Sequence, residues 1–161
     1  MKMIRYEIDD TIKEQFDYYK NMCALLSEFT DSEFGPPAEI EKIEQWEKDN
    51  NVRLPHQYKS WLLLTEYARI IGGYIEFRWP QMGSSDAEND VIVIGAVVGD
   101  GEELLISRES GKIFSFFDGE TEEYEDFDDL LTCLSGFMEH SAEEYLGADW
   151  GDIYDERFEL G

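Results

Sequence analysis

The sequence predicts an α+β domain with a mainly antiparallel sheet of about four to six strands, flanked by N-terminal and C-terminal helices. Three observations support this class. Apolar residues recur at helical spacing in the first part of the chain, β-branched and alternating runs separated by glycine turns fill the middle, and helical spacing returns near the end. Helices and strands that are segregated in this way favour α+β over alternating βαβ units.

The first helix is expected from about Asp10 to Phe29, where apolar residues repeat at three- and four-residue spacing. Asp9 and Asp10 lie near its amino end, where carboxylates interact favourably with the helix dipole. Residues 1–8 alternate only weakly, so a strand and a frayed lead-in both stay open. Residues 30–35 are expected to form a linker.

Two shorter helices are expected to begin at prolines and to meet at a tight corner. The first follows Pro36-Pro37 and ends at Asn50-Asn51, because asparagine tolerates the left-handed cap conformation. Its buried residues should be Ile40, Ile43 and Trp46.

The second of these helices should have Pro55 at its first position, because proline has a fixed φ and no N–H to lose there. Trp61 is expected in the core. The apolar pattern continues through Tyr67 to about Ile71, where Gly72-Gly73 is expected to stop the helix.

The strands are expected in the middle of the chain as an antiparallel meander. They cover residues 74–79, 90–98, 104–106 and 112–117 and a short stretch near Tyr124. Pro80 should close the first strand, and Gly95 predicts a bulge or a bend in the second. Turns such as Asp118-Gly119 supply positive φ at hairpin spacing and connect the later strands.

A last helix is expected from Phe127 to about Met138. Three carboxylates suit its amino end, namely Asp126, Asp128 and Asp129. Tyr154 and Phe158 are spaced for a short docked helix in the tail that follows. The sequence leaves open whether this tail docks on the core or extends to a partner, and whether Trp150 is buried.

Composition limits the class of protein. With 161 residues, of which 42% are hydrophobic and 14% aromatic, the chain can bury one full core, so a single domain over residues 1–161 is expected. No apolar run approaches the roughly 18 residues of a membrane span, and Asp9 and Asp10 stand where a signal peptide needs apolar residues, so we expect a soluble cytoplasmic protein. Cys23 and Cys133 are expected to be buried thiols.

No pattern predicts catalysis, a metal or a cofactor. His56 and His140 lie far apart without a ligand at metal spacing, and serine or cysteine nucleophiles lack an evident base nearby. Gly95, Gly99 and Gly101 precede acidic residues that would repel a phosphate. The segment 118–122 lacks the ligand pattern of a calcium loop and is interpreted as an acidic hairpin turn. The lack of such patterns weakens the hypothesis of catalysis. It stays open, because folding can bring together residues that are distant in the sequence.

The charge is the most unusual property of the sequence. Asp and Glu number 38 against 13 Lys and Arg, a formal net charge of −25. Sixteen acidic residues follow Lys112, against one basic residue, Arg157. Such a field repels nucleic acid and anionic membranes and accelerates encounter with a basic protein. The alternative is that the charge serves solubility alone.

Several motifs resemble the SUKH superfamily, which includes a fungal regulator of cell-wall synthesis and many bacterial immunity proteins. They are Pro36-Pro37 before an acidic helix, Trp46-Glu47, the run from Val52 to Tyr58 with Leu54-Pro55, and Trp61 to Leu64. Asn51 stands where the family usually has glycine. The likeness covers residues 36–135, preceded by a helical extension over 1–35 and followed by an acidic, aromatic tail over 136–161.

The resemblance implies a non-enzymatic immunity protein that covers a cognate toxin domain, often a nuclease. Because a nuclease presents Lys and Arg to phosphates, an acidic surface can imitate its substrate. The predicted partner-binding residues are Asp118, Glu120, Glu122, Glu123, Glu125, Asp126, Asp128 and Asp129. The alternatives are a regulatory or scaffolding module, as the fungal branch implies, and an acid-rich hydrolase.

Overall fold

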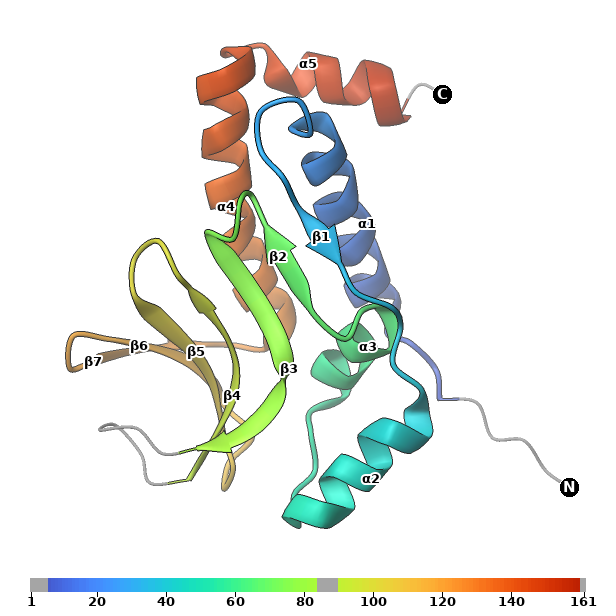
Figure 1. Cartoon of the computed structure of the whole chain (residues 1–161), viewed down its shortest axis with the longest axis vertical. Coiled ribbons are helices and arrows are strands. Elements are labelled where there is room, and N and C mark those ends of the chain that lie inside the picture. Colours follow the sequence, from blue (N-terminus) through green and yellow to red (C-terminus); the bar gives the residue numbers. More distant parts are fainter. Residues whose placement is uncertain (1–5, 84–89, 160–161) are drawn as a thin grey trace, which may run out of the picture.

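The computed structural model describes residues 6–83 and 90–159. Within these residues the fold is α+β, as predicted, and seven antiparallel strands form one sheet in chain order from β1 to β7 (Figure 1). The sheet has more strands than the four to six expected. Its strands are β1 (Glu33–Phe34), β2 (Ala68–Ile70), β3 (Ile75–Gly83), β4 (Val91–Val97), β5 (Glu102–Ser107), β6 (Ile113–Phe117) and β7 (Glu120–Tyr124).

The helices gather mainly on one face of the sheet (Figure 1). They are α1 (Asp10–Leu25), α2 (Ile40–Asn50), α3 (His56–Leu64), α4 (Phe127–Leu146), α5 (Trp150–Tyr154) and a π-helical turn (Asp155–Glu159). Among the described residues, no helix is both long enough and apolar enough to cross a membrane.

Trp61 lies at the centre of the core between the helices and the sheet. Its side chain is fully buried, and its ring contacts Phe16 and Tyr19 from α1, Phe77 from β3 and Phe127 from α4 at centroid distances of 5.0–5.9 Å. Edge-to-face and tilted contacts of this kind add to the hydrophobic stabilisation of a core. The predicted burial of Trp61 is therefore confirmed.

A largely buried ion pair connects α2 and α3 at the corner between them. Lys59 Nζ lies 3.1 Å from Glu47 Oε1, with both side chains less than one sixth exposed. The other carboxylate oxygen of Glu47 accepts a hydrogen bond of 2.7 Å from the backbone N–H of Leu54. Asn51 has φ of +52°, which confirms the predicted left-handed end of α2.

The helix starts differ from the prediction. Pro36 and Pro37 lie outside α2, which begins at Ile40, and Pro55 is the residue before α3 and not its first. Pro37 is exposed on an extended approach to α2, where it fixes φ without needing a hydrogen bond. Of the three apolar residues expected to be buried in α2, Ile43 is buried, whereas Ile40 and Trp46 are half-buried.

The prediction that α3 continues to about Ile71 is wrong, because the helix ends at Leu64. Thr65 is extended, and its hydroxyl donates to the carbonyl oxygens of Gly35 at 3.0 Å and Tyr67 at 2.6 Å. These bonds draw residues 68–70 into strand β2. β2 pairs with β1, which lies in the segment 30–35 that was expected to be only a linker.

Two irregularities shape β3 and β4. The strand β3 does not close at Pro80 as predicted but runs to Gly83, and its register with β4 shifts between Phe77 and Gln81. Pro80 lies inside this shift, where a ladder N–H is not required. The bulge predicted at Gly95 is confirmed by a second shift between Val93 and Gly95, where an added Cβ would come within 2.1 Å of the Glu76 carbonyl oxygen.

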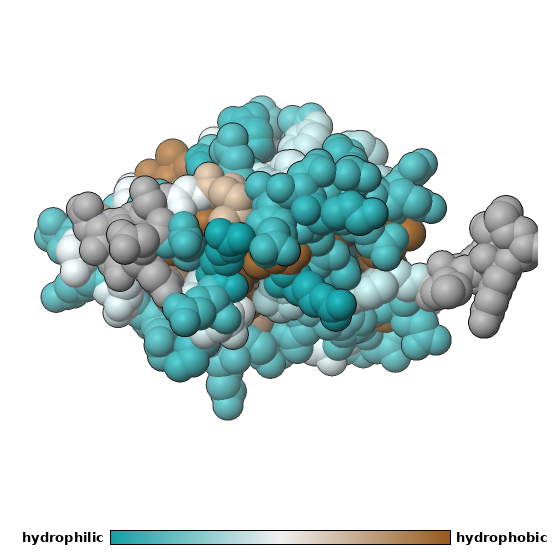
Figure 2. All heavy atoms as spheres, turned by 90° about the horizontal axis from the view of Figure 1, so that it is seen from below, coloured by the Kyte–Doolittle hydropathy of each residue, from teal (hydrophilic) through white to brown (hydrophobic). Residues whose placement is uncertain are grey.

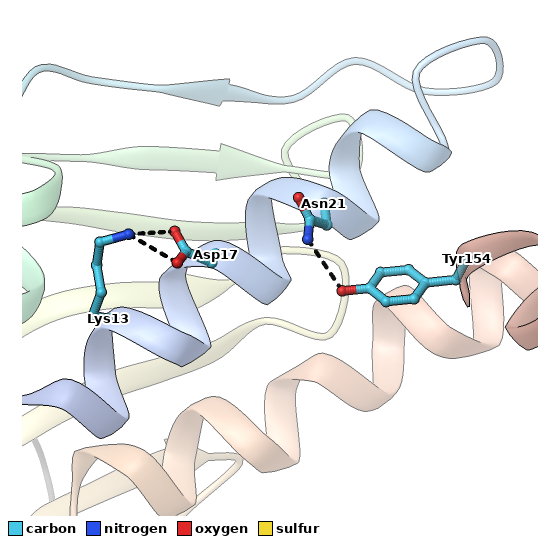
Figure 3. Close-up of polar contacts among 4 residues, drawn as sticks. All are labelled: Lys13, Asp17, Asn21 and Tyr154. Carbon is cyan, nitrogen blue, oxygen red and sulfur yellow. Dashed lines mark hydrogen bonds and ion pairs between the residues drawn. The ribbon is translucent and has the colours of Figure 1, made fainter. Parts of the chain in front are cut away.

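The C-terminal segment docks on the body of the domain. Tyr154 is 8% exposed, and its hydroxyl accepts a hydrogen bond of 3.2 Å from Asn21 Nδ2 of α1 (Figure 3). Its ring lies 5.6 Å from Tyr18 and 5.0 Å from Phe158. The two alternatives that the sequence left open for the tail are thus decided in favour of docking, and Trp150 is half-buried against the same core. 

The two thiols have different environments. Cys23 is buried, as expected, and burial raises the pKa of its thiol. Cys133 is exposed on α4, so the prediction of a second buried thiol is wrong. Helical spacing placed Cys133 near apolar neighbours in the sequence, but the three residues between Leu130 and Leu134 include the solvent-facing side of the helix.

Candidate functional site

The β6–β7 hairpin forms the edge of the sheet and carries half of the predicted partner-binding residues. β7 pairs with β6 alone, and Asp118-Gly119 connects them with φ of +51° and +82°. Positive φ at both central residues is the signature of a type I′ turn, which matches the twist of a hairpin. The turn predicted from Asp118-Gly119 is therefore confirmed.

The side chains of β7 alternate between the two faces of the sheet. Glu120 and Glu122 lie opposite Phe117 and Ser115, on the face that packs toward α4. Glu123 lies opposite Phe114, on the other face. All three glutamates are exposed, so this edge presents carboxylates in both directions.

We call Asp118, Glu120, Glu122 and Glu123 the edge carboxylates. Within the described residues, no hydrogen bond or ion pair engages the side chains of Asp118, Glu120 or Glu122. Glu123 has one loose partner, Lys112 Nζ at 3.8 Å, and both side chains are about two-thirds exposed. Exposed pairs of this kind contribute little to stability. The edge carboxylates are thus available as hydrogen-bond acceptors.

The carboxylates at the start of α4 are used differently. We call Asp126, Asp128 and Asp129 the cap carboxylates. Asp126 Oδ1 accepts 2.8 Å from the backbone N–H of Asp129, and Asp129 Oδ2 accepts 3.0 Å from the N–H of Glu125. This reciprocal capping satisfies N–H groups that the first turn leaves without a partner.

Long-range hydrogen bonds hold the same helix start against α1 and α3. Asp128 Oδ1 accepts 2.9 Å from Gln15 Nε2, and the backbone N–H of Asp128 donates 2.8 Å to Gln57 Oε1. Gln57 also donates to Asp126 Oδ2 at 3.4 Å. Gln15 and Gln57 were not predicted from the sequence, because isolated glutamines carry no pattern that indicates a partner so far along the chain.

Tyr124 and Cys133 lie between the two groups of carboxylates. Burial raises the pKa of the Cys133 thiol, and the charges of Asp129 and Glu122 raise it further. Burial also raises the pKa of Tyr124, with added contributions from Glu122 and Glu102. Cys133 is thus within reach of one edge carboxylate and one cap carboxylate, whereas Tyr124 is affected by the edge carboxylate Glu122 and by Glu102, so these acids form one negative region. Glu102 belongs to this region and was missed, because its position on β5 follows from strand register alone.

Beside the helix start lies a cavity of about 200 Å³ between α3, the β5–β6 turn and the segment before α4. Glu125 and Asp126 line it together with His56 and Lys112. The side chain of Glu125 is exposed, and no hydrogen bond engages its carboxylate among the described residues. The eight predicted residues are therefore neighbours along one edge, but only five of them have carboxylates that the fold leaves without a firm partner.

Within the described residues, no group of three or more histidine, cysteine, aspartate or glutamate side chains is arranged to hold a metal ion. Comparison of the chain with family models and with curated proteins gives no match.

Proposed function

We propose that this protein is a non-enzymatic binding protein of the immunity type, which neutralises a basic toxin domain through the edge carboxylates. The observation that carries the proposal is the set of exposed carboxylates along the β6–β7 hairpin: no described residue forms a hydrogen bond or ion pair with Asp118, Glu120 or Glu122, and Glu123 has only the loose contact with Lys112. A carboxylate that already accepts internal hydrogen bonds must break them to bind a partner. Asp118, Glu120 and Glu122 have no such bonds to break, and the exposed contact of Glu123 with Lys112 costs little to lose.

The chemistry of the region suits a partner that binds phosphates. A nuclease holds the nucleic-acid backbone with Lys and Arg, whose N–H groups form short, strong bonds to carboxylate as well as to phosphate oxygens. Four carboxylates along one hairpin can occupy such a set of cations. A formal net charge of −25 also accelerates the encounter of the two proteins.

The positions of these carboxylates favour a role in binding over a role in stabilising the fold. Like charges on neighbouring positions repel each other, and here no described cation offsets Glu120 or Glu122. Charges also protect an edge strand from pairing with other strands, and this role would be filled by lysine equally well. All the charged residues of β7 are acidic, which fits a partner that is basic.

Co-expression in bacteria tests the proposal. The chain is expressed together with each product of the genes that flank its own gene, and growth is measured. We expect one basic product to arrest growth alone and to be neutralised by this chain. The fourfold variant D118N/E120Q/E122Q/E123Q, called the edge variant, should lose protection.

A matched control keeps the net charge equal. The variant E14Q/E28Q/E41Q/E44Q, called the distributed variant, removes four exposed carboxylates that no described residue engages, on α1, α2 and the turn after α1. It should protect as well as the unchanged chain. Equal protection by both variants would contradict the proposed site, and the absence of any toxic flanking product would contradict the immunity function.

A further inference from the structure

A second hollow lies at the other end of α4. It has a volume of about 280 Å³ and lies between the turn after α1, the β2–β3 turn and the C-terminal half of α4. Three aromatic side chains line it, namely Tyr74, Phe137 and Tyr145, together with the carboxylate of Glu144. We call these four residues the aromatic pocket. Neither lysine nor arginine is among the described residues that line it.

Tyr74 is held in position by a hydrogen bond outside the pocket and by contacts of its ring. Its hydroxyl donates a hydrogen bond of 2.6 Å to Asp100 Oδ1, and its ring lies 5.2 Å from that of Phe137. The ring also crosses Gly99 so closely that an added Cβ would come within 2.0 Å of Tyr74 Cε2. The close approach of the Tyr74 ring to the backbone at position 99 therefore favours glycine there, and the ring packs directly against that backbone.

Tyr145, which also lines the pocket, stacks on the ring of Phe29. Its ring and that of Phe29 are 4.8 Å apart and almost parallel, with an interplanar angle of 6°. Both side chains remain unusually exposed for their size, at 48% and 43%. Exposed aromatic side chains beside a hollow are typical of binding surfaces, where a ring face is accessible to a partner.

The backbone at the floor of the pocket is strained. Ile71 has φ of +46°, a left-handed conformation that β-branched residues rarely adopt. Its carbonyl accepts from the N–H of Tyr74 at 3.3 Å, and the adjacent Gly72 donates to the Asp31 carbonyl at 2.6 Å. Strain of this kind persists where the surrounding structure fixes it, and it concentrates at binding sites.

The aromatic rings and the carboxylate that line the pocket suit a cationic ligand. Aromatic ring faces attract ammonium and guanidinium groups, and guanidinium also stacks on them because it is planar. Glu144 adds a carboxylate. His140 also lines the pocket, and its Nε2 lies 3.2 Å from Glu144 Oε1; both side chains are mostly exposed, so an incoming guanidinium group replaces a weak, solvent-screened contact. The volume lies just below the roughly 300–1,000 Å³ of small-molecule pockets, which fits a single side chain.

We propose that the aromatic pocket binds an arginine side chain of the basic partner, with its guanidinium group against the ring faces and paired with Glu144. This inference rests on the proposed function for the nature of the partner. It adds a second anchor, at the opposite end of α4 from the cap carboxylates. The aromatic pocket should prefer a planar cation, because guanidinium stacks on ring faces, whereas the edge carboxylates should bind any positively charged group.

Titration of the full chain with a small probe tests the pocket directly. The probe is N-acetyl-arginine N-methylamide, and its neutral counterpart is the corresponding citrulline derivative, both at constant ionic strength. The ring signals of Tyr74, Phe137 and Tyr145 are followed by NMR. We expect saturable shifts at roughly millimolar arginine probe and at least several-fold weaker binding of the citrulline probe.

Two variants separate the pocket from the general charge. E144Q removes the carboxylate in the pocket and should weaken arginine binding at least about threefold. E143Q removes the same charge from the next residue, which is exposed and does not line the pocket, and should bind as before. Equal shifts with both probes, no saturable shift, or equal weakening by both variants would overturn the proposal.

The use of the pocket by the partner is tested separately in the growth assay. E144Q should protect less well than E143Q, and equal protection by the two would overturn the role of the pocket as a partner anchor. Because the probe titration needs no partner, it can succeed when no toxic product exists. Failure of the pocket and failure of the immunity function are therefore distinguishable.

Discussion

The cap carboxylates and the edge carboxylates are the same chemical groups, a few residues apart in sequence, and the fold uses them in opposite ways. Asp126, Asp128 and Asp129 accept hydrogen bonds from the helix start, from Gln15 and from Gln57. Asp118, Glu120 and Glu122 are engaged by no described residue. A run of acidic residues is therefore not one functional unit.

The difference separates stability from binding. A carboxylate that accepts N–H bonds from its own chain stabilises the fold, whereas an exposed one beside like charges opposes compaction slightly. We expect substitutions of the bonded group to change the free energy of unfolding. Substitutions of the edge group should change only interactions with other molecules.

Glu47 should give the largest loss of stability, because its side chain is only 12% exposed and its two carboxylate oxygens each have a partner. Replacement of Glu47 by alanine removes the ion-pair partner of Lys59, which among the described residues keeps only its contact with the Tyr6 ring, and leaves the N–H of Leu54 without its acceptor. We expect a loss of about 3 kcal/mol in the free energy of unfolding, measured with urea. The control is Glu44→Ala on the same helix, where no described residue engages the carboxylate and the change should stay below about 0.5 kcal/mol.

Asp126 should give the next largest effect. Asp126→Ala removes the side-chain cap of α4, which should cost about 1 kcal/mol in the same urea experiment. Glu125→Ala, at the preceding residue, leaves this cap in place and should cost less. Equal losses for the two would mean that the cap carboxylates contribute no more to stability than their exposed neighbour.

The edge variant D118N/E120Q/E122Q/E123Q should leave stability almost unchanged. We expect the free energy of unfolding to change by less than about 0.5 kcal/mol, or to rise as repulsion falls. Asparagine suits position 118, because it tolerates the positive φ found there. A loss above about 1 kcal/mol in the urea measurement would erase the contrast with the cap carboxylates.

Cys133 offers a small but local measure of the edge charges. Because burial, Asp129 and Glu122 raise the pKa of its thiol, less thiolate forms at a given pH, and alkylation should begin at higher pH than for a free cysteine. Glu122→Gln removes one of these causes, so the midpoint of the pH–rate profile with iodoacetamide should move to lower pH. Cys23 is buried and should stay silent in the folded protein. An unmoved midpoint would place Glu122 too far from Cys133 to act on it.

Local patterns in the sequence were sufficient for several features. Asp118-Gly119 predicted its turn, Gly95 its bulge and Asp126 the start of α4, because each depends on the conformation of a few adjacent residues. The spacing of Tyr154 and Phe158 allowed a short docked helix but left open whether the tail docks on the core. These signals lie within one or two turns of chain.

Features that depend on distant residues were missed or wrong. The end of α3 is decided by hydrogen bonds from Thr65 to Gly35 and Tyr67, and no helical pattern reports on those acceptors. The division between edge and cap carboxylates depends on Gln15, which is remote from Asp128 in the chain. The local pattern of acidic residues therefore indicates a negative region but does not distinguish the carboxylates that accept hydrogen bonds from those that do not.

The most direct test is to capture partners from native host lysate with three immobilised proteins, the unchanged chain, the edge variant and the distributed variant, at low and at moderate salt. Bound proteins are identified by mass spectrometry. If the edge carboxylates bind a basic toxin domain, one basic protein will be retained by the unchanged chain and by the distributed variant, will be lost from the edge variant, and will dissociate as salt rises. Retention of that protein equally by both variants would contradict the binding role of the edge carboxylates.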